Sequence, residues 1–116
     1  MNTIFSMVMK RFDSFSSSKK LNSMKELTFK NLKLNLDLKS CMFNEKIIPL
    51  TKHEFELLKF LIQNKNKIHS RQDILKSVWN SKVELRTVDA TVSRLRKKIN
   101  TNYITTRLGF GYGLIE

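Results

Sequence analysis

The sequence has little cysteine and no long hydrophobic run, and each absence excludes a class of protein. One cysteine, Cys41, stands among 116 residues. It excludes an intrachain disulfide framework and a multi-thiolate metal cluster, and it fits a reducing cytoplasm. No apolar run approaches the roughly 20 residues needed to span a bilayer. The segment from Met1 to Met9 lacks the basic start and long apolar region of a secretion signal. We therefore expect a cytoplasmic chain that does not enter the membrane.

Motifs for catalysis are also missing. The segment from His53 to Leu57 lacks the second histidine of an H-E-x-x-H metal site, and the other histidine, His69, is distant in sequence. No glycine-rich phosphate loop follows a predicted strand. We expect no enzyme activity, no metal and no cofactor.

Basic charge is the most prominent property that the sequence does have. Lys and Arg total 22 against 10 Asp and Glu, which gives a formal net charge of +12. Such a balance favours a polyanionic partner, either nucleic acid or an anionic membrane surface. The chain length allows one domain with a tail. We assign the polar, serine- and lysine-rich residues 1–26 to a tail or linker, and residues 27–116 to the domain.

Period-two patterning after the tail predicts strands. Four leucines alternate with polar residues, as in a strand with one solvated face: Leu32, Leu34, Leu36 and Leu38. Asn44-Glu45 is predicted to turn a hairpin, so a small antiparallel sheet is expected before residue 49. A second hairpin is predicted from residues 104–107 and 112–115 around the glycine-containing segment 108–111.

Three helices are predicted between these hairpins. The T-x-x-E capping box of Thr51 and Glu54 opens the first, which runs to about Asn64. A helix of nine or ten residues follows Ser70 and ends at Asn80-Ser81. The third is expected from about residue 87 to 99, with one apolar stripe and a second face of small residues followed by basic ones. That second face comprises Thr87, Ala90, Thr91, Arg94, Lys97 and Lys98.

This order of elements predicts an α+β winged helix-turn-helix, with an N-terminal antiparallel sheet, three helices and a C-terminal hairpin as the wing. In that fold the last helix enters a DNA major groove and the wing rests on the adjacent backbone. Arg94 has the forked donors that pair with guanine O6 and N7, while the small residues of the same face allow close approach. A solvated basic face on an ordinary helix is the alternative interpretation.

The residues also carry a family resemblance. The segment from Leu50 to Leu58 resembles the LTxxEFxLL signature of OmpR/PhoB-type response-regulator DNA-binding domains. Later segments agree in order and spacing, so the resemblance covers residues 27–116. These segments are Ser70-Arg71, Leu75 to Trp79, Arg86 to Asp89, Leu95 to Lys98, and Gly109 to Tyr112.

The resemblance implies a four-stranded N-terminal sheet and a transcriptional regulator that binds promoter DNA as head-to-tail pairs on direct repeats. It places four residues against bases: Thr87, Ala90, Thr91 and Arg94. Four others are placed near phosphates: Trp79, Arg86, Ser93 and Tyr112. From its residue type alone, Trp79 is expected to pack between helices and at most to offer its indole N–H to a phosphate. We add five candidates for backbone contact from the basic helix end and the wing: Arg96, Lys97, Lys98, Thr106 and Arg107. For Arg96 the resemblance implies either a place close to the DNA backbone or an intramolecular pair.

Three departures from the family pattern leave parts of this interpretation open. The family commonly has a basic residue directly before the Gly-x-Gly-Tyr turn, where this chain has Leu108. Its arginine, Arg107, lies one position earlier and therefore on the opposite strand face. The connection from Trp79 to Arg86 is short for a family whose loop there often contacts RNA polymerase.

Residues 1–13 resemble the last helix of a receiver, the phosphoacceptor domain that normally precedes this module. A fragment, a truncated gene and a stand-alone regulator are all compatible with that resemblance.

Two other function classes stay open at this stage. A winged helix can present its basic helix to an acidic protein surface, and this one could heterodimerise with a full-length regulator and titrate it. A basic amphipathic helix can also bind a membrane surface, but the apolar stripe of the third helix is needed for the core.

Overall fold

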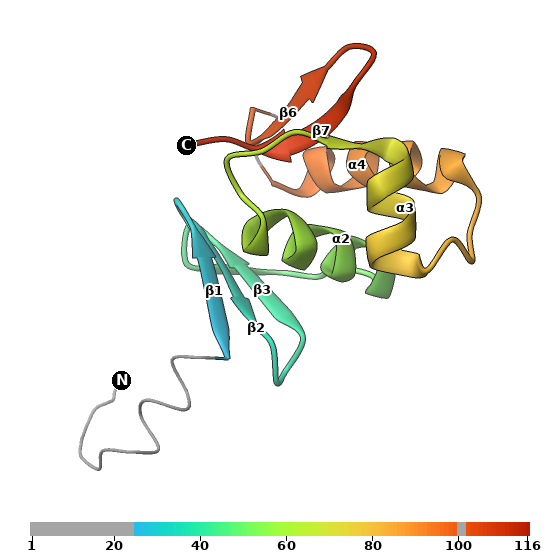
Figure 1. The fold of residues 1–116 in the computed structure, drawn as a ribbon. Helices are drawn as coiled ribbons and strands as arrows, with labels where there is room; N and C mark the ends of the chain where they lie inside the picture. The colour runs from blue at the N-terminus through green and yellow to red at the C-terminus, as the bar shows by residue number, and fades with distance from the viewer. Residues whose placement is uncertain (1–24, 100–101) are drawn as a thin grey trace.

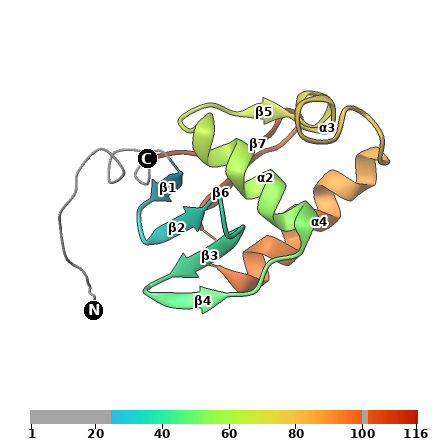
Figure 2. The same ribbon diagram turned by 90° about the horizontal axis from the view of Figure 1, so that it is seen from below.

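The computed structural model describes residues 25–99 and 102–116. The chain begins with a four-stranded antiparallel sheet whose strands neighbour one another in chain order (Figure 1, Figure 2). The predicted N-terminal sheet is therefore confirmed. Its strands are β1 (Glu26–Phe29), β2 (Leu32–Asn35), β3 (Ser40–Phe43) and β4 (Lys46–Ile48). The tail predicted over residues 1–26 lies outside the described residues up to residue 24, and Glu26 already belongs to β1.

The turns of this sheet both confirm and correct the predictions. Asn44 and Glu45 have φ values of 53° and 65°, as a two-residue primed turn requires, so the predicted hairpin is confirmed. The single strand predicted through Leu38 is wrong. β2 ends at Asn35, whose side-chain Oδ1 accepts the Leu38 N–H at 2.9 Å and closes a turn. Leu38 is consequently 75% exposed.

Three helices follow the sheet, as predicted: α2 (Lys52–Gln63), α3 (Arg71–Trp79) and α4 (Leu85–Lys98). Both halves of the Thr51 and Glu54 capping box are present. α3 ends at Asn80 in the left-handed conformation, with φ of 52°. α4 begins two residues earlier than predicted, because Glu84 is extended and serves as the N-cap residue.

The predicted C-terminal hairpin is part of a three-stranded sheet, which has one strand more than the sequence indicates. β6 (Ile104–Arg107) and β7 (Gly111–Leu114) form the wing, and β5 (His69–Ser70) pairs with the other edge of β7. β5 is too short to give a periodic signal. Glycine is required opposite it, because a Cβ on Gly111 would lie 1.8 Å from the carbonyl oxygen of His69.

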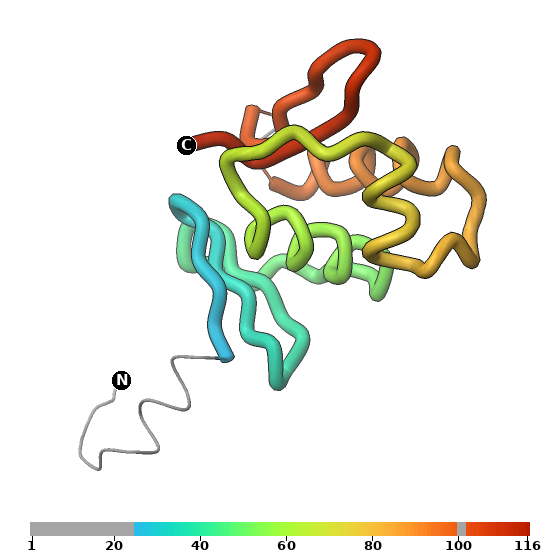
Figure 3. Tube along the Cα trace, in the orientation of Figure 1, coloured from blue at the N-terminus to red at the C-terminus, as the bar shows by residue number. Residues whose placement is uncertain are grey.

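α2 lies between the N-terminal sheet and the unit formed by α4 and the wing (Figure 1). Its apolar face is buried as predicted, and so is the stripe of α4, which comprises Val88, Val92, Leu95 and Ile99. The tube in Figure 3 shows the wing loop projecting from the body of the domain beside α4. This packing leaves the outer face of α4 and the tip of the wing in solvent. None of the described helices is long and apolar enough to cross a membrane.

Candidate nucleic-acid interface

The outer face of α4 carries one exposed basic residue in its first turn, small exposed residues in its middle and basic residues toward its end. These exposed residues are Arg86, Ala90, Ser93, Arg94 and Lys97. Thr87 is half-buried on the same helix. Arg86 forms an ion pair with Glu84 at 2.6 Å, but both side chains are largely in solvent, so this pair can open at little cost.

Thr91 does not lie on this exposed face, which corrects the prediction from periodicity. Its side chain is 0% exposed. Its hydroxyl donates to the Thr87 carbonyl at 2.7 Å and accepts from Arg94 Nη2 at 3.3 Å. Because α4 packs against both α2 and α3, its buried surface is wider than a single stripe. The Thr91 hydroxyl is therefore engaged within the helix and is not presented to a ligand.

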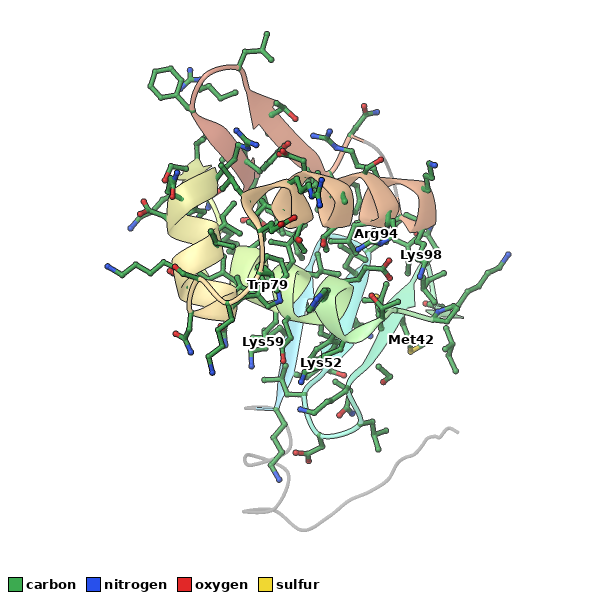
Figure 4. The ribbon with its side chains drawn as sticks, turned by 90° about the vertical axis from the view of Figure 1, so that its right-hand side faces the viewer. Met42, Lys52, Lys59, Trp79, Arg94 and Lys98 are labelled. Carbon is green, nitrogen blue, oxygen red and sulfur yellow. The ribbon has the colours of Figure 1, made fainter. Side chains whose placement is uncertain are left out.

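A buried carboxylate lies beneath the basic end of α4. Glu54 of α2 is 0% exposed. Its Oε2 accepts from Arg94 Nε at 3.2 Å, and its Oε1 accepts from Lys98 Nζ at 2.7 Å and from the Thr51 N–H at 2.9 Å. Figure 4 shows Arg94 and Lys98 on the side of α4 turned toward α2 and the N-terminal sheet. Burial by itself would raise the pKa of Glu54, but the bonds from Lys98 and Thr51 and the nearby cations lower it below its ordinary value.

A second carboxylate, Asp89, joins three elements. The guanidinium of Arg71 on α3 donates two hydrogen bonds to it, at 3.0 and 2.6 Å, and the Tyr112 hydroxyl on β7 donates a third at 2.7 Å. Partial burial opposes ionisation, yet these bonds lower the pKa of Asp89. Burial and the bond to Asp89 raise the pKa of Tyr112. Tyr112, predicted near phosphates, thus has its hydroxyl hydrogen committed to α4.

Arg96 is directed toward the wing. Its Nη2 donates to the Ile104 carbonyl at 2.7 Å and to the Thr106 hydroxyl, and its guanidinium lies 5.7 Å from the centre of the Tyr112 ring. Its Nε is buried and has no hydrogen-bond partner among the described residues. Arg96 therefore holds β6 and β7 on α4, which is the intramolecular alternative that the family resemblance implied for it.

Trp79 is likewise an internal residue. Its side chain is buried, its Nε1 donates to His53 Nδ1 at 3.1 Å, and the two rings meet edge to face with centroids 5.2 Å apart. The expected packing of Trp79 between helices is thus confirmed, and its indole N–H is bonded between α3 and α2.

The wing tip combines apolar exposure with one basic residue. Leu108 is 89% exposed and Phe110 is 68% exposed. Arg107 is paired with Gly111 and lies on the strand face opposite Thr106 and Tyr112. It lines a cavity of about 580 Å³ between the wing and the start of α3, together with Arg71. In the described part of the chain, no group of three His, Cys, Asp or Glu side chains could hold a metal ion.

Comparison with known proteins agrees with this geometry. The family described as "Transcriptional regulatory protein, C terminal" matches residues 44–114. The chain belongs to this family. The transcriptional regulatory protein SrrA of Staphylococcus aureus is 36% identical over 94 residues, which cover 74% of this chain and 39% of SrrA. This chain thus spans about two fifths of the length of that relative.

Solved structures of the family have the same fold. The response regulator DrrB, an OmpR/PhoB homologue of Thermotoga maritima, superposes with a TM-score of 0.71 at 26% identity, over 91% of this chain and 56% of DrrB. The DNA-binding domain of AdeR, solved in complex with an intercistronic region, gives a TM-score of 0.67 at 30% identity, over 77% of this chain and 98% of that domain. The resemblance to OmpR/PhoB-type effector domains and the winged-helix fold are confirmed, and the chain is a transcriptional DNA-binding domain of the response-regulator type.

Proposed function

We propose that this domain binds double-stranded promoter DNA with α4 in the major groove and the wing against the neighbouring backbone. The observation that carries the proposal is the exposed face of α4, which presents small residues between basic ones beside the wing. A helix fits the major groove, and small residues near its start allow close approach to base edges. AdeR, a structural relative, was solved with a DNA region.

Within this proposal the predicted contacts divide into three groups. Thr87, Ala90 and Arg94 are assigned to bases, since Ala90 and Arg94 are exposed and Thr87 is half-buried. Exposed residues of α4 and one exposed residue of the wing strand β6 are assigned to phosphates: Arg86, Ser93 and Lys97 on α4, and Arg107 on β6. Arg94 also has internal partners, but 47% of its side chain is exposed. The remaining predicted contacts are assigned to holding the domain together through their internal partners: Trp79, Thr91, Arg96, Lys98, Thr106 and Tyr112.

Assembly on DNA is a further part of the proposal. The family resemblance supports head-to-tail pairs on direct repeats and leaves contact with RNA polymerase open. A cytoplasmic location follows from the same resemblance.

Selection from a random duplex library, followed by competition shift assays, tests the function directly. A sequence-specific domain prefers the selected duplex over bulk duplex, whereas a module that titrates another regulator through protein contacts prefers none. Neutralisation of about five to seven phosphates predicts a log-log salt slope of roughly −4 to −6. An affinity that is flat between low and moderate salt would contradict nucleic-acid binding.

Two matched variants then distinguish recognition of a base pair from general electrostatic attraction to the DNA backbone. Arg94→Ala should lose about 1 to 3 kcal/mol of discrimination at one base pair, because a forked guanine contact specifies sequence. Lys97→Ala should weaken all duplexes alike and reduce the salt slope by about 1. If Arg94→Ala selected the parental consensus, Arg94 would not be a base reader.

A further inference from the structure

The one fully buried carboxylate among the described residues forms ion pairs with two basic side chains of the proposed DNA-binding helix. Glu54 belongs to the first turn of α2, but Arg94 and Lys98, which it binds, are four residues apart on α4. Both basic side chains keep part of their surface in solvent, 47% for Arg94 and 33% for Lys98. The carboxylate therefore lies beneath the recognition face and neutralises part of its charge from inside.

The guanidinium of Arg94 is held at two of its nitrogens. Nε donates to Glu54 and Nη2 donates to the Thr91 hydroxyl, which in turn donates to the Thr87 carbonyl. A planar group bonded at two nitrogens has a fixed plane and direction. A free arginine side chain would lose rotamer entropy on reaching a base, whereas a side chain held in advance has already lost it.

We propose that Glu54 is a positioning residue for DNA recognition: it sets the direction of the Arg94 guanidinium and withholds Arg94 and Lys98 from indiscriminate phosphate contact. This inference rests on the proposed reading of a base by Arg94. Thr91 supports the same geometry from the helix itself, so its influence on recognition is indirect.

Glu54→Gln separates this role from the capping role of the same side chain. Glutamine at this position of a capping box can still accept the Thr51 N–H, so the start of α2 is retained. The amide carries no charge, and neither cation then has an ionic partner at this position. Because both cationic side chains already reach solvent, they can move outward without being left buried.

We expect Glu54→Gln to change two binding measurements in opposite directions: discrimination at one base pair should fall, and affinity for bulk duplex should rise. Glu54→Gln should lower discrimination at the base pair identified by Arg94→Ala about tenfold, since an unheld guanidinium samples several directions. Affinity for bulk duplex should rise, and the log-log salt slope should steepen by about 1 to 2, because two cations become available to phosphates. If Glu54 had a purely structural role, the substitution would lower the affinities for the selected duplex and for bulk duplex together.

Three controls locate the effect at Arg94. Lys98→Met removes the other cation and leaves the Arg94 contact intact, so discrimination should be retained. Thr91→Val removes the second support without changing the shape of the side chain, and it should lower discrimination about threefold with Glu54 in place. In an Arg94→Ala background, Glu54→Gln should have no further effect on base preference, which is the non-additivity expected of coupled residues. Thermal melting of each variant shows that it is folded, and Thr91→Val keeps the inference testable if Glu54→Gln does not fold.

Two results would overturn the inference while leaving the proposed function standing. One is an unchanged consensus and salt slope in a folded Glu54→Gln variant. The other is an equal loss of affinity for selected and bulk duplex. A parent chain that prefers no duplex would instead overturn the proposed function, and this inference with it.

Discussion

The hydroxyl of Tyr112 lies 2.7 Å from Oδ1 of Asp89, and this hydrogen bond fixes the wing to α4. Seven residues further along α4, which is about two turns, Arg96 bonds to β6, and its guanidinium lies 5.7 Å from the centre of the same tyrosine ring. Two contacts two turns apart determine how the wing lies relative to the helix. Because Asp89 also binds Arg71, α3 is joined to the same point.

Loss of the hydroxyl in Tyr112→Phe should reduce the free energy of unfolding by about 1.5 to 3 kcal/mol, because one hydrogen bond to a charged acceptor is removed. The ring and its contact with Arg96 remain. Urea denaturation measures the change, and Thr105→Ala, at an exposed position of the neighbouring strand, should stay within about 0.5 kcal/mol. Equal stability of Tyr112→Phe and the parent would show that the bond does not hold the wing.

The strand face of Arg107 leads to a prediction about the wing. Side chains alternate along β6, so Arg107 lies opposite the face that Leu108 would share with Thr106. Arg107→Ala should cost under about 1 kcal/mol of DNA-binding free energy, as loss of one screened charge does. Leu108→Arg should tighten binding to sites with a narrow A·T-rich minor groove.

Titrations on A-tract and G·C-flanked versions of one selected site measure both effects. A large, A-tract-dependent loss for Arg107→Ala would mean that the hairpin turns its arginine into the groove on binding.

Truncation in the core should affect the fold. Phe55→Ala and Leu95→Ala each remove a buried side chain, and each should cost about 3 kcal/mol through the cavity left behind. Leu38→Ala is the matched control, because this leucine is 75% exposed and should change stability by less than about 0.5 kcal/mol. Thermal melting compares the three, and an unchanged midpoint for Leu95→Ala would contradict the assigned face of α4.

Acid should destabilise the domain through its two engaged carboxylates. The pKa values of Glu54 and Asp89 are lowered in the folded state. Their contribution is therefore complete above the unfolded-state pKa, near 4, and is lost as pH falls through the lower folded-state values. Urea midpoints should be level from pH 7 to about pH 5 and then decrease. Glu54→Gln should make that decrease shallower, and an equally steep decrease would show that Glu54 does not contribute to it.

The sequence by itself determined the elements whose causes are local. The capping box of Thr51 and Glu54, the Asn44-Glu45 turn and the Asn80 helix end each depend on residues within a few positions of one another. The apolar stripe of α4 could also be predicted, because helical periodicity places its members on one face. These local signals, in their order along the chain, were enough to predict the winged-helix architecture.

Only the tertiary structure decided which polar groups are engaged inside the domain. Thr91 falls off the apolar stripe in sequence, yet packing of α4 against two helices buries it. For Arg96 the sequence left contact with the DNA backbone and an intramolecular pair open, and the structure shows that it bonds to a strand that follows α4. Glu54 gave only a capping signal, since its cationic partners are 40 and 44 residues away. Periodicity reports the side of an element on which a residue lies, and contact between distant elements determines what that residue meets there.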